Sequence, residues 1–433
     1  MSETLVLSDT LQWGHDALQL SFSLTTGQPP RLSEISARGT SPISIPTGLP
    51  LMDVLLVSAG HALASGRLVH TRVGESLRFA GHEATEDESG VQLVIVADDI
   101  ERDLRLRMKL SSPWGVPVFT SRVEIENVSN ATTVILQSVT SWSSYAGHSP
   151  TTDSDPAKWS LTRGYSDWLA EGRWMVEPLD SLRMPDEASW LTGHNSRGAR
   201  AFASEGTWST GKHIPVAVLS SEVDAFAWAW QIEHNGGWRF EIGRDIDDAY
   251  FALGGPTDID HQWTHTLAPG DTFESVPVAI ALGTDMTTAV AALTTYRRVV
   301  RRPSADNTNL PIVFNDYMNT LNGDPTTEKL EPLIDAAADI GADIFCIDAG
   351  WYDDTSDWWD SVGLWEPSTT RFRDGLGAIT NRIRDRGMIP GLWLEPEVVG
   401  VKSLVADRLP TEAFFSRHGE RVVEQGRYHL DLR

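Results

Sequence analysis

Carboxylates and aromatic side chains follow three short apolar segments in the last third of the chain. These groups are Asn315-Asp-Tyr-Met-Asn319, Asp348-Ala-Gly-Trp-Tyr-Asp-Asp354 and Trp393-Leu-Glu-Pro-Glu397. Ionised carboxylates accept hydrogen bonds, so they suit hydroxyl groups, and aromatic faces stack on the apolar faces of sugar rings. The combination favours a neutral polyhydroxylated ligand over a phosphate, which needs glycine-rich loops and helix N-termini.

The spacing of the residues in the third group supports this interpretation. If it continues an extended strand, Trp393, Glu395 and Glu397 share one face, because successive side chains alternate across a strand. That face offers a stacking platform beside hydrogen-bond acceptors. The alternative is that polar residues gather at these positions only because the rim of a fold is polar.

Strands and helices alternate around these groups. We predict strands over 311–315, 343–348 and 389–394, with helices over 326–339 and 376–386. Repeated βα units imply a parallel sheet, either doubly wound or a barrel, and ligands gather at the carboxyl ends of its strands. A (β/α)8 barrel takes about 250 residues, so residues 311–433 predict half a barrel cut from a longer chain, or a small open sheet.

The sequence before residue 285 predicts β structure. Period-two alternation predicts strands over 103–110 and 121–126, and short apolar runs separated by turn signals predict further strands. Asp285 is the expected N-cap of a helix over 286–300. The expected fold is therefore multidomain β plus α/β. It has a large N-terminal β-sandwich over 1–284, a linker helix and loop over 285–310, and the first three βα units of a (β/α)8 TIM barrel over 311–433.

Composition disfavours several classes of partner. The formal net charge is -25 over 433 residues, which disfavours nucleic acid and anionic membranes as partners. No run of about 18 apolar residues is present, and the N-terminus lacks the basic start and apolar stretch of a signal peptide. The single cysteine, Cys346, fits a reducing compartment. We expect a cytoplasmic location.

Metal and serine chemistry have little support. His261 and His265 have the spacing of a helical ligand pair, but they lie in a predicted β region. Four residues along a strand span roughly 13 Å, which is too far for one ion. The Gly-x-Ser-x-Gly pattern of a nucleophilic serine is absent. We therefore expect no metal and no cofactor.

The strand-end motifs resemble those of glycoside hydrolase family 36, the melibiase-type α-galactosidases. The resemblance rests on four segments: Asn315-Asp-Tyr317, Ile347-Asp-Ala-Gly-Trp-Tyr352, Gly387-Met-Ile-Pro-Gly-Leu-Trp-Leu-Glu-Pro-Glu397 and Gly426-Arg-Tyr-His-Leu-Asp-Leu432. Two further segments, Tyr165-Ser-Asp-Trp168 and Gly172-Arg-Trp174, are similar to a loop of the family's large N-terminal domain.

The resemblance implies retaining hydrolysis of terminal α-linked galactose from oligosaccharides, by a homo-oligomer. In the family, the nucleophile is an aspartate after the fourth barrel strand and the acid/base is an aspartate after the sixth. Both positions are expected beyond Arg433, so no catalytic residue is assigned and the 433 residues alone are expected to be inactive. The motifs make Glu395 and Glu397 binding or structural groups rather than the catalytic pair.

The resemblance also implies substrate-binding residues. Asp348 matches the first aspartate of the family's Asp-Asp-Gly-Trp motif, which receives galactose hydroxyls, and Trp393 matches a tryptophan that lines the sugar pocket. The full expected set is Asp348, Trp393, Arg427, Tyr317, Asp316, Trp351 and Glu395.

Two departures from the family pattern leave the specificity open. Ala349 replaces the second aspartate of the motif, and Tyr317 stands where the family usually has a tryptophan. Specificity for another α-glycoside, such as α-N-acetylgalactosaminide, therefore remains an alternative. Two other functions remain as alternatives: a non-catalytic carbohydrate-binding remnant, and a structural module built on the sandwich.

Overall fold

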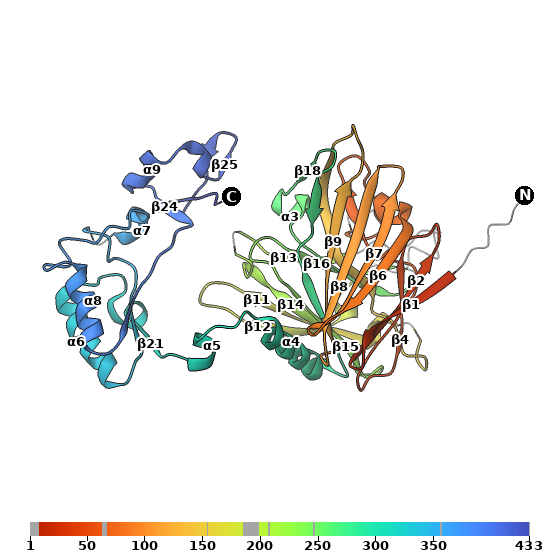
Figure 1. Cartoon of the computed structure of the whole chain (residues 1–433), viewed down its shortest axis with the longest axis horizontal. Coiled ribbons are helices and arrows are strands. Elements are labelled where there is room, and N and C mark those ends of the chain that lie inside the picture. Colours follow the sequence, from red (N-terminus) through yellow and green to blue (C-terminus); the bar gives the residue numbers. More distant parts are fainter. Residues whose placement is uncertain are drawn as a thin grey trace, which may run out of the picture. The chain divides into compact units, whose positions relative to one another are not determined.

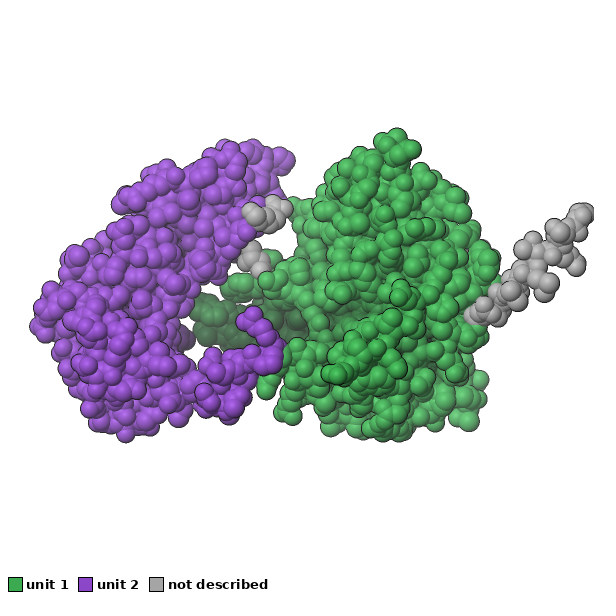
Figure 2. Space-filling view, in the orientation of Figure 1, with its two compact units in different colours: residues 1–301 green, residues 302–433 purple. Residues whose placement is uncertain are grey.

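The computed structural model describes residues 8–62, 67–153, 155–184, 199–206, 208–245, 247–355 and 357–432. The chain forms two compact units, Met1–Arg301 and Arg302–Arg433 (Figures 1 and 2). Each unit is described by itself below. No helix in the described ranges is long and apolar enough to cross a membrane.

Unit 1 is built from antiparallel sheets, as predicted. Its largest sheet has the strand order β12-β11-β14-β15-β20-β9-β8-β7-β6, with β19 paired to β9. A second sheet has the order β13-β16-β17-β10-β18, with β5 paired to β10, and a third has the order β1-β2-β3-β4. The elements of unit 1 are β1 (Ser8–His15), β2 (Leu18–Thr25), β3 (Arg31–Ala37), β4 (Ile43–Ser44), β5 (Val54–Leu56), α1 (Arg72–Ser76), β6 (Arg78–Glu86), β7 (Gly90–Asp99), β8 (Leu104–Pro113), β9 (Val118–Asn127), β10 (Val134–Tyr145), β11 (Trp159–Ser166), β12 (Arg173–Pro178), β13 (Ala199–Ala203), β14 (Lys212–Ser221), β15 (Phe226–Ile232), β16 (Arg239–Arg244), β17 (Ala249–Gly254), α3 (Asp258–His261), β18 (His265–Leu267), β19 (Thr272–Glu274), β20 (Val278–Gly283) and α4 (Met286–Val300).

The predicted alternation is realised in β8. Leu104 and Leu106 are buried in the core, whereas Arg107 lies on the other face, where its guanidinium donates to Glu124 at 2.8 Å and to Glu126 at 2.7 Å. One face of the sheet is therefore apolar and the other carries cross-strand ion pairs, which is what period-two alternation produces.

Helix α4 begins where the sequence predicted. Asp285 accepts a hydrogen bond from the backbone N–H of Thr288, and the Thr288 side chain completes a capping box. The buried face of the helix carries Ala292 and Tyr296, which pack with small apolar residues of β9, β15 and β20. The predicted linker helix is thus packed on the large sheet of unit 1 (Figure 1).

The expected β region around the two histidines was wrong in part. His261 ends helix α3, and only His265 lies in a strand, β18. The helix begins at Thr257, whose side chain accepts from the N–H of Asp260, a cap that the threonine type favours. Within the described ranges, no group of three or more His, Cys, Asp or Glu side chains is arranged to hold a metal ion.

A buried carboxyl group in unit 1 gives a stability prediction. Asp53 is fully buried, accepts from the N–H and hydroxyl of Thr71 at 2.8 and 2.7 Å, and its burial raises its pKa to about 7. The unfolded value is about 4. The stabilisation that comes from protonated Asp53 is therefore complete below pH 4 and is lost as the pH rises through 7.

We expect Asp53→Asn to stabilise the protein at pH 8 by on the order of 2 kcal/mol and to have little effect at pH 4, because the amide stays neutral at both. Thermal unfolding of both proteins at the two pH values measures this difference. An equal change in Tm at pH 4 and pH 8 would contradict the prediction.

Unit 2 contains a parallel three-stranded sheet in the order β21-β22-β23. Val313, Phe314 and Asn315 pair with residues 344–346, and residues 344–347 pair with 389–392. The elements of unit 2 are α5 (Asp306–Asn309), β21 (Val313–Asn315), an irregular helical turn (Tyr317–Leu321), α6 (Thr327–Asp339), β22 (Ile344–Ile347), α7 (Trp358–Ser361), α8 (Leu376–Asp385), β23 (Ile389–Leu392), β24 (Val398–Gly400), α9 (Leu404–Arg408), β25 (Ser416–Arg417), β26 (Glu420–Arg421), β27 (Val423–Glu424) and β28 (Arg427–His429).

The three strands and two helices predicted for this unit are confirmed. Helices α6 and α8 lie side by side (Figure 1), and their apolar faces, with Leu330, Ile334 and Ile379, share one core with Phe345 of the sheet. Val313 and Ile389, by contrast, are more than half exposed.

The predicted extent of the third strand was wrong. β23 ends at Leu392, so Trp393, Glu395 and Glu397 do not continue it as one extended face. Pro396 has no N–H to donate to a ladder, and residues 396–397 form a turn. Strand β24 follows, and it pairs with β28 in a small antiparallel sheet with β27.

Candidate functional site

Asp348 stands at the carboxyl end of β22, the middle strand of the parallel sheet. One carboxylate oxygen accepts from the side-chain amide of Asn315 at 2.6 Å, and the other accepts from the N–H of Ala349 at 2.7 Å. The Asn315 amide is itself oriented, because its oxygen accepts from the N–H of Tyr317 at 2.8 Å. Both oxygens of Asp348 are thus fixed as acceptors, with further lone pairs available for hydroxyl groups.

Asp316 lies beside Asp348 and is only 2% exposed. Its carboxylate accepts from the backbone N–H of Asp348 at 2.7 Å. Burial, with the nearby Asp348 charge as a smaller cause, raises its pKa to about 6. Asp316 therefore fixes the backbone that carries Asp348.

Aromatic rings surround the end of β23. The Trp393 ring lies 5.8 Å from that of Trp358 and 6.0 Å from that of Trp365, both edge to face, and 6.5 Å from that of Tyr352 in a stacked orientation. Trp351 is almost fully buried, and its indole N–H donates to the Trp393 carbonyl at 3.0 Å. This aromatic cluster joins the segments that follow β22 and β23.

Tyr317 extends the cluster to the segment that follows β21. Its ring meets that of Trp358 edge to face at 5.8 Å. Partial burial and the Asp348 charge raise the pKa of its hydroxyl, so the phenol is protonated at neutral pH and can donate a hydrogen bond.

Glu395 and Arg427 form an ion pair near the cluster. The Arg427 guanidinium donates to Glu395 at 2.6 Å and lies 3.7 Å from the centre of the Trp359 ring. Burial raises the pKa of Glu395 despite the opposing charge of Arg427. The pair brings β28 and the end of β23 together, although 32 residues separate them in the chain.

The seven sequence-predicted site residues thus form three groups. Asp348 bonds Asp316 directly and bonds Asn315, which in turn bonds Tyr317. Trp351 and Trp393 are joined by the indole contact, and Glu395 and Arg427 by their ion pair. The expected binding set left out Asn315 and Tyr352, although both stand in the strand-end motifs, and the sequence prediction missed Trp358, Trp359 and Trp365. The tryptophan-rich stretch between residues 358 and 365 was the signal that could have found these three.

Cys346 adds no nucleophile to the site. Burial, and then the charges of Asp348 and Asp316, raise the pKa of its thiol to about 11. The thiolate is the reactive form of cysteine, so this group is unreactive at neutral pH.

The segments that resemble a family loop of the N-terminal domain form the hairpin of β11 and β12 in unit 1. At its tip Trp168 is 73% exposed, and Trp174 on β12 is also exposed. Arg163 inside the hairpin stacks on the Tyr165 ring, 4.6 Å from its centre, and donates to Glu177 at 2.7 Å.

Comparison with known proteins adds to this geometry. Residues 272–433 match the family model Melibiase. Alpha-galactosidase 1 of Pediococcus pentosaceus is 26% identical over 248 residues, which are 55% of this chain and 33% of that protein. Alpha-galactosidase Mel36A of Lactobacillus acidophilus is 26% identical over 244 residues, which are 54% of this chain and 33% of that protein.

The chain is therefore similar to the melibiase family over residues 272–433. It spans about a third of the length of these two relatives. The crystal structure of the GH36 α-galactosidase AgaA from Geobacillus stearothermophilus superposes with a TM-score of 0.78 at 17% identity, and the match covers 98% of this chain and 61% of that one. The likeness shows the fold expected from the sequence, a large β-sandwich followed by the first part of a TIM barrel.

Proposed function

We propose that this chain carries the sugar-binding part of a retaining α-galactosidase. The observation that supports it most is the Asp348 carboxylate, held by Asn315 and by the N–H of Ala349 beside an aromatic cluster. A fixed double acceptor beside aromatic faces suits a terminal sugar, with hydroxyls on the carboxylate and the ring on an indole. The two relatives named above are α-galactosidases, and one AgaA structure is a complex with raffinose.

The proposed chemistry needs two carboxyl groups about 5–5.5 Å apart, one as nucleophile and one as acid/base. The family resemblance assigns both roles to aspartates after the fourth and sixth barrel strands. Glu395 is a poor substitute, because Arg427 already occupies one of its oxygens. We propose that residues 1–433 bind the substrate and that the hydrolytic pair comes from barrel strands outside them.

The 433 residues alone are expected to give no turnover of nitrophenyl α-galactoside above a buffer blank. The full-length protein, meaning the 433 residues together with the barrel strands proposed to lie outside them, is expected to hydrolyse this substrate. NMR of the released sugar is expected to show the α anomer first, because retention preserves the configuration. Activity that follows the 433-residue chain through purification would place the catalytic pair within it. A full-length protein that binds galactose without turnover would support the carbohydrate-binding remnant instead.

Specificity is tested with a second substrate. Ala349 has a methyl group where the family motif has a carboxylate, so one pair of hydroxyl contacts is missing. We propose galactose as the preferred sugar, and the comparison is kcat/KM for nitrophenyl α-galactoside against nitrophenyl α-N-acetylgalactosaminide. A higher value for the second substrate would overturn the galactose assignment and keep the hydrolase class.

A further inference from the structure

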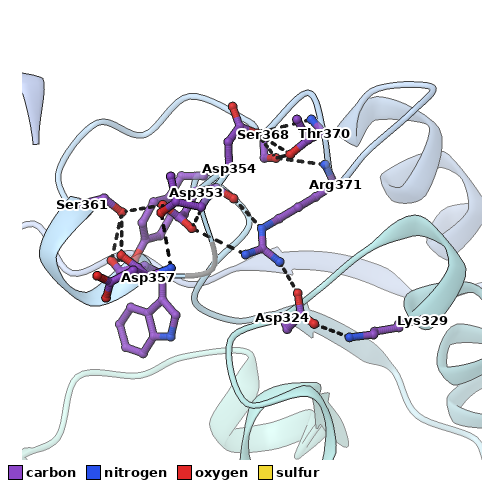
Figure 3. A network of polar contacts seen from close by, with 12 residues as sticks. Asp324, Lys329, Asp353, Asp354, Asp357, Ser361, Ser368, Thr370 and Arg371 are labelled. Carbon is purple, nitrogen blue, oxygen red and sulfur yellow. Dashed lines mark hydrogen bonds and ion pairs between the residues drawn. The ribbon is translucent and has the colours of Figure 1, made fainter.

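Arg371 joins the two loops that follow β21 and β22. Its side chain is 6% exposed. The guanidinium donates to the Asp324 carboxylate in the first loop and to the Asp353 carbonyl in the second, and it lies 3.6 Å from the Asp353 carboxylate (Figure 3). One buried cation thus holds both loops at once.

Asp353, the partner in the second loop, orders the residues around α7. Its carboxylate accepts from the hydroxyl of Ser361 at 2.9 Å (Figure 3). It also accepts from the hydroxyl and the N–H of Thr355, each at 2.9 Å. Ser361 is the last residue of α7. The Arg371–Asp353 contact therefore anchors the short helix that carries Trp358.

The first loop contacts the same tryptophan. Gly323 directly precedes Asp324, and a methyl group added at Gly323 would lie 2.2 Å from the indole nitrogen of Trp358. The indole therefore packs directly on this glycine. Its ring also meets the rings of Tyr317 and Trp393, each at 5.8 Å.

We propose that Arg371 is a positioning residue for the sugar-binding site, which clamps the two loops so that Trp358 stands against Tyr317 and Trp393. This inference rests on the proposed function, because it assigns Arg371 a role in sugar binding. The neighbouring Phe372 is buried in the core of unit 2, so the backbone of this segment is anchored without the Arg371 side chain. Loss of the guanidinium should release the loops while the core stays folded.

The test compares Arg371→Met with Arg373→Met in the full-length protein. Arg373 lies two residues away, is 60% exposed and pairs only loosely with Glu328 and Asp374, at 3.4 Å each, so exposed pairs of this kind are worth little. We expect Arg371→Met to raise KM for nitrophenyl α-galactoside about tenfold with kcat nearly unchanged. This pattern indicates the loss of an interaction that binds the substrate and the transition state equally well. Arg373→Met should match the wild type.

A purely structural role would give a different pattern. It would lower the fraction of folded enzyme, so kcat per total protein would fall while KM stayed constant, and this result would overturn the proposal. An unchanged KM and kcat would also overturn it. If Arg371→Met does not fold, Asp324→Asn removes the charge of one partner of the same clamp and is expected to raise KM severalfold.

Hydrogen exchange separates this proposal from the proposed function. Without sugar, the amides of residues 357–361 should exchange faster in Arg371→Met than in Arg373→Met, because the clamp that orders them is lost. If the wild type turns over no galactoside, the proposed function fails and the exchange rates alone decide whether Arg371 clamps the loop. Equal rates in the two variants would show that it does not.

Discussion

Asp348→Asn is expected to lower kcat/KM for α-galactosides by roughly 100-fold or more in the full-length protein. Hydrogen bonds to a charged group contribute about 1.5–3 kcal/mol each, and two lost sugar hydroxyl contacts account for this factor. The substitution also disturbs the free site. Both oxygens of Asp348 accept hydrogen bonds, from Asn315 and from the N–H of Ala349, whereas an amide has only one oxygen. Either orientation of the new side chain sets its NH2 group against another donor.

Asp343→Asn is the matched control for this prediction. Asp343 directly precedes β22 at the opposite end of the strand, where one carboxylate oxygen accepts from the N–H of Ile312 at 2.8 Å. An amide oxygen accepts the same bond, so turnover should stay near that of the wild type. Steady-state kinetics on both variants make the measurement. An Asp348→Asn enzyme with wild-type kcat/KM would remove Asp348 from the sugar site.

The fold was predicted best where local sequence patterns, such as the periodic alternation of apolar and polar residues, determine the structure. The alternation in β8 follows from which side chains must be buried, and the Asp285 cap follows from the chemistry of a helix terminus. Because parallel strands end at a common edge, the sequence alone predicts that Asp316 and Asp348 lie close together.

Contacts within the long loops had no such signal. Trp358 lies in a four-residue helix, and its place against Tyr317 and Trp393 depends on the Arg371 clamp, whose partners are 47 and 18 residues away along the chain. Pro396 could have signalled the early end of β23, but a second contribution to it could not be seen. The Trp393 carbonyl accepts from the Trp351 indole, and this tertiary contact cannot be seen in the local pattern.

Gly350→Ala is expected to be among the most damaging single changes in unit 2, although it adds one methyl group. Gly350 has φ +94°, and an added Cβ would lie 2.1 Å from the backbone carbonyl oxygen of Gly323. Backbone atoms cannot rotate away as a side chain does, so the loops after β21 and β22 must separate. We expect the free energy of unfolding to fall by about 3 kcal/mol or more, from backbone strain and overpacking together. Because Asp348 and Trp351 lie within two residues of this glycine, galactose affinity should fall as well.

Gly341→Ala separates the two causes of that damage. Gly341 also has a positive φ, +83°, but no atom lies within 4 Å of its added Cβ. It follows helix α6, where its N–H donates to the Ala338 carbonyl at 3.0 Å, so the substitution carries only the strain of the left-handed backbone, about 1 kcal/mol. Thermal unfolding and galactose titration of the two variants measure the contrast. Gly341→Ala should bind galactose like the wild type. Equal destabilisation of the two variants would mean that the loops after β21 and β22 do not meet at Gly323 and Gly350, and the clamp proposed for Arg371 would lose its basis as well.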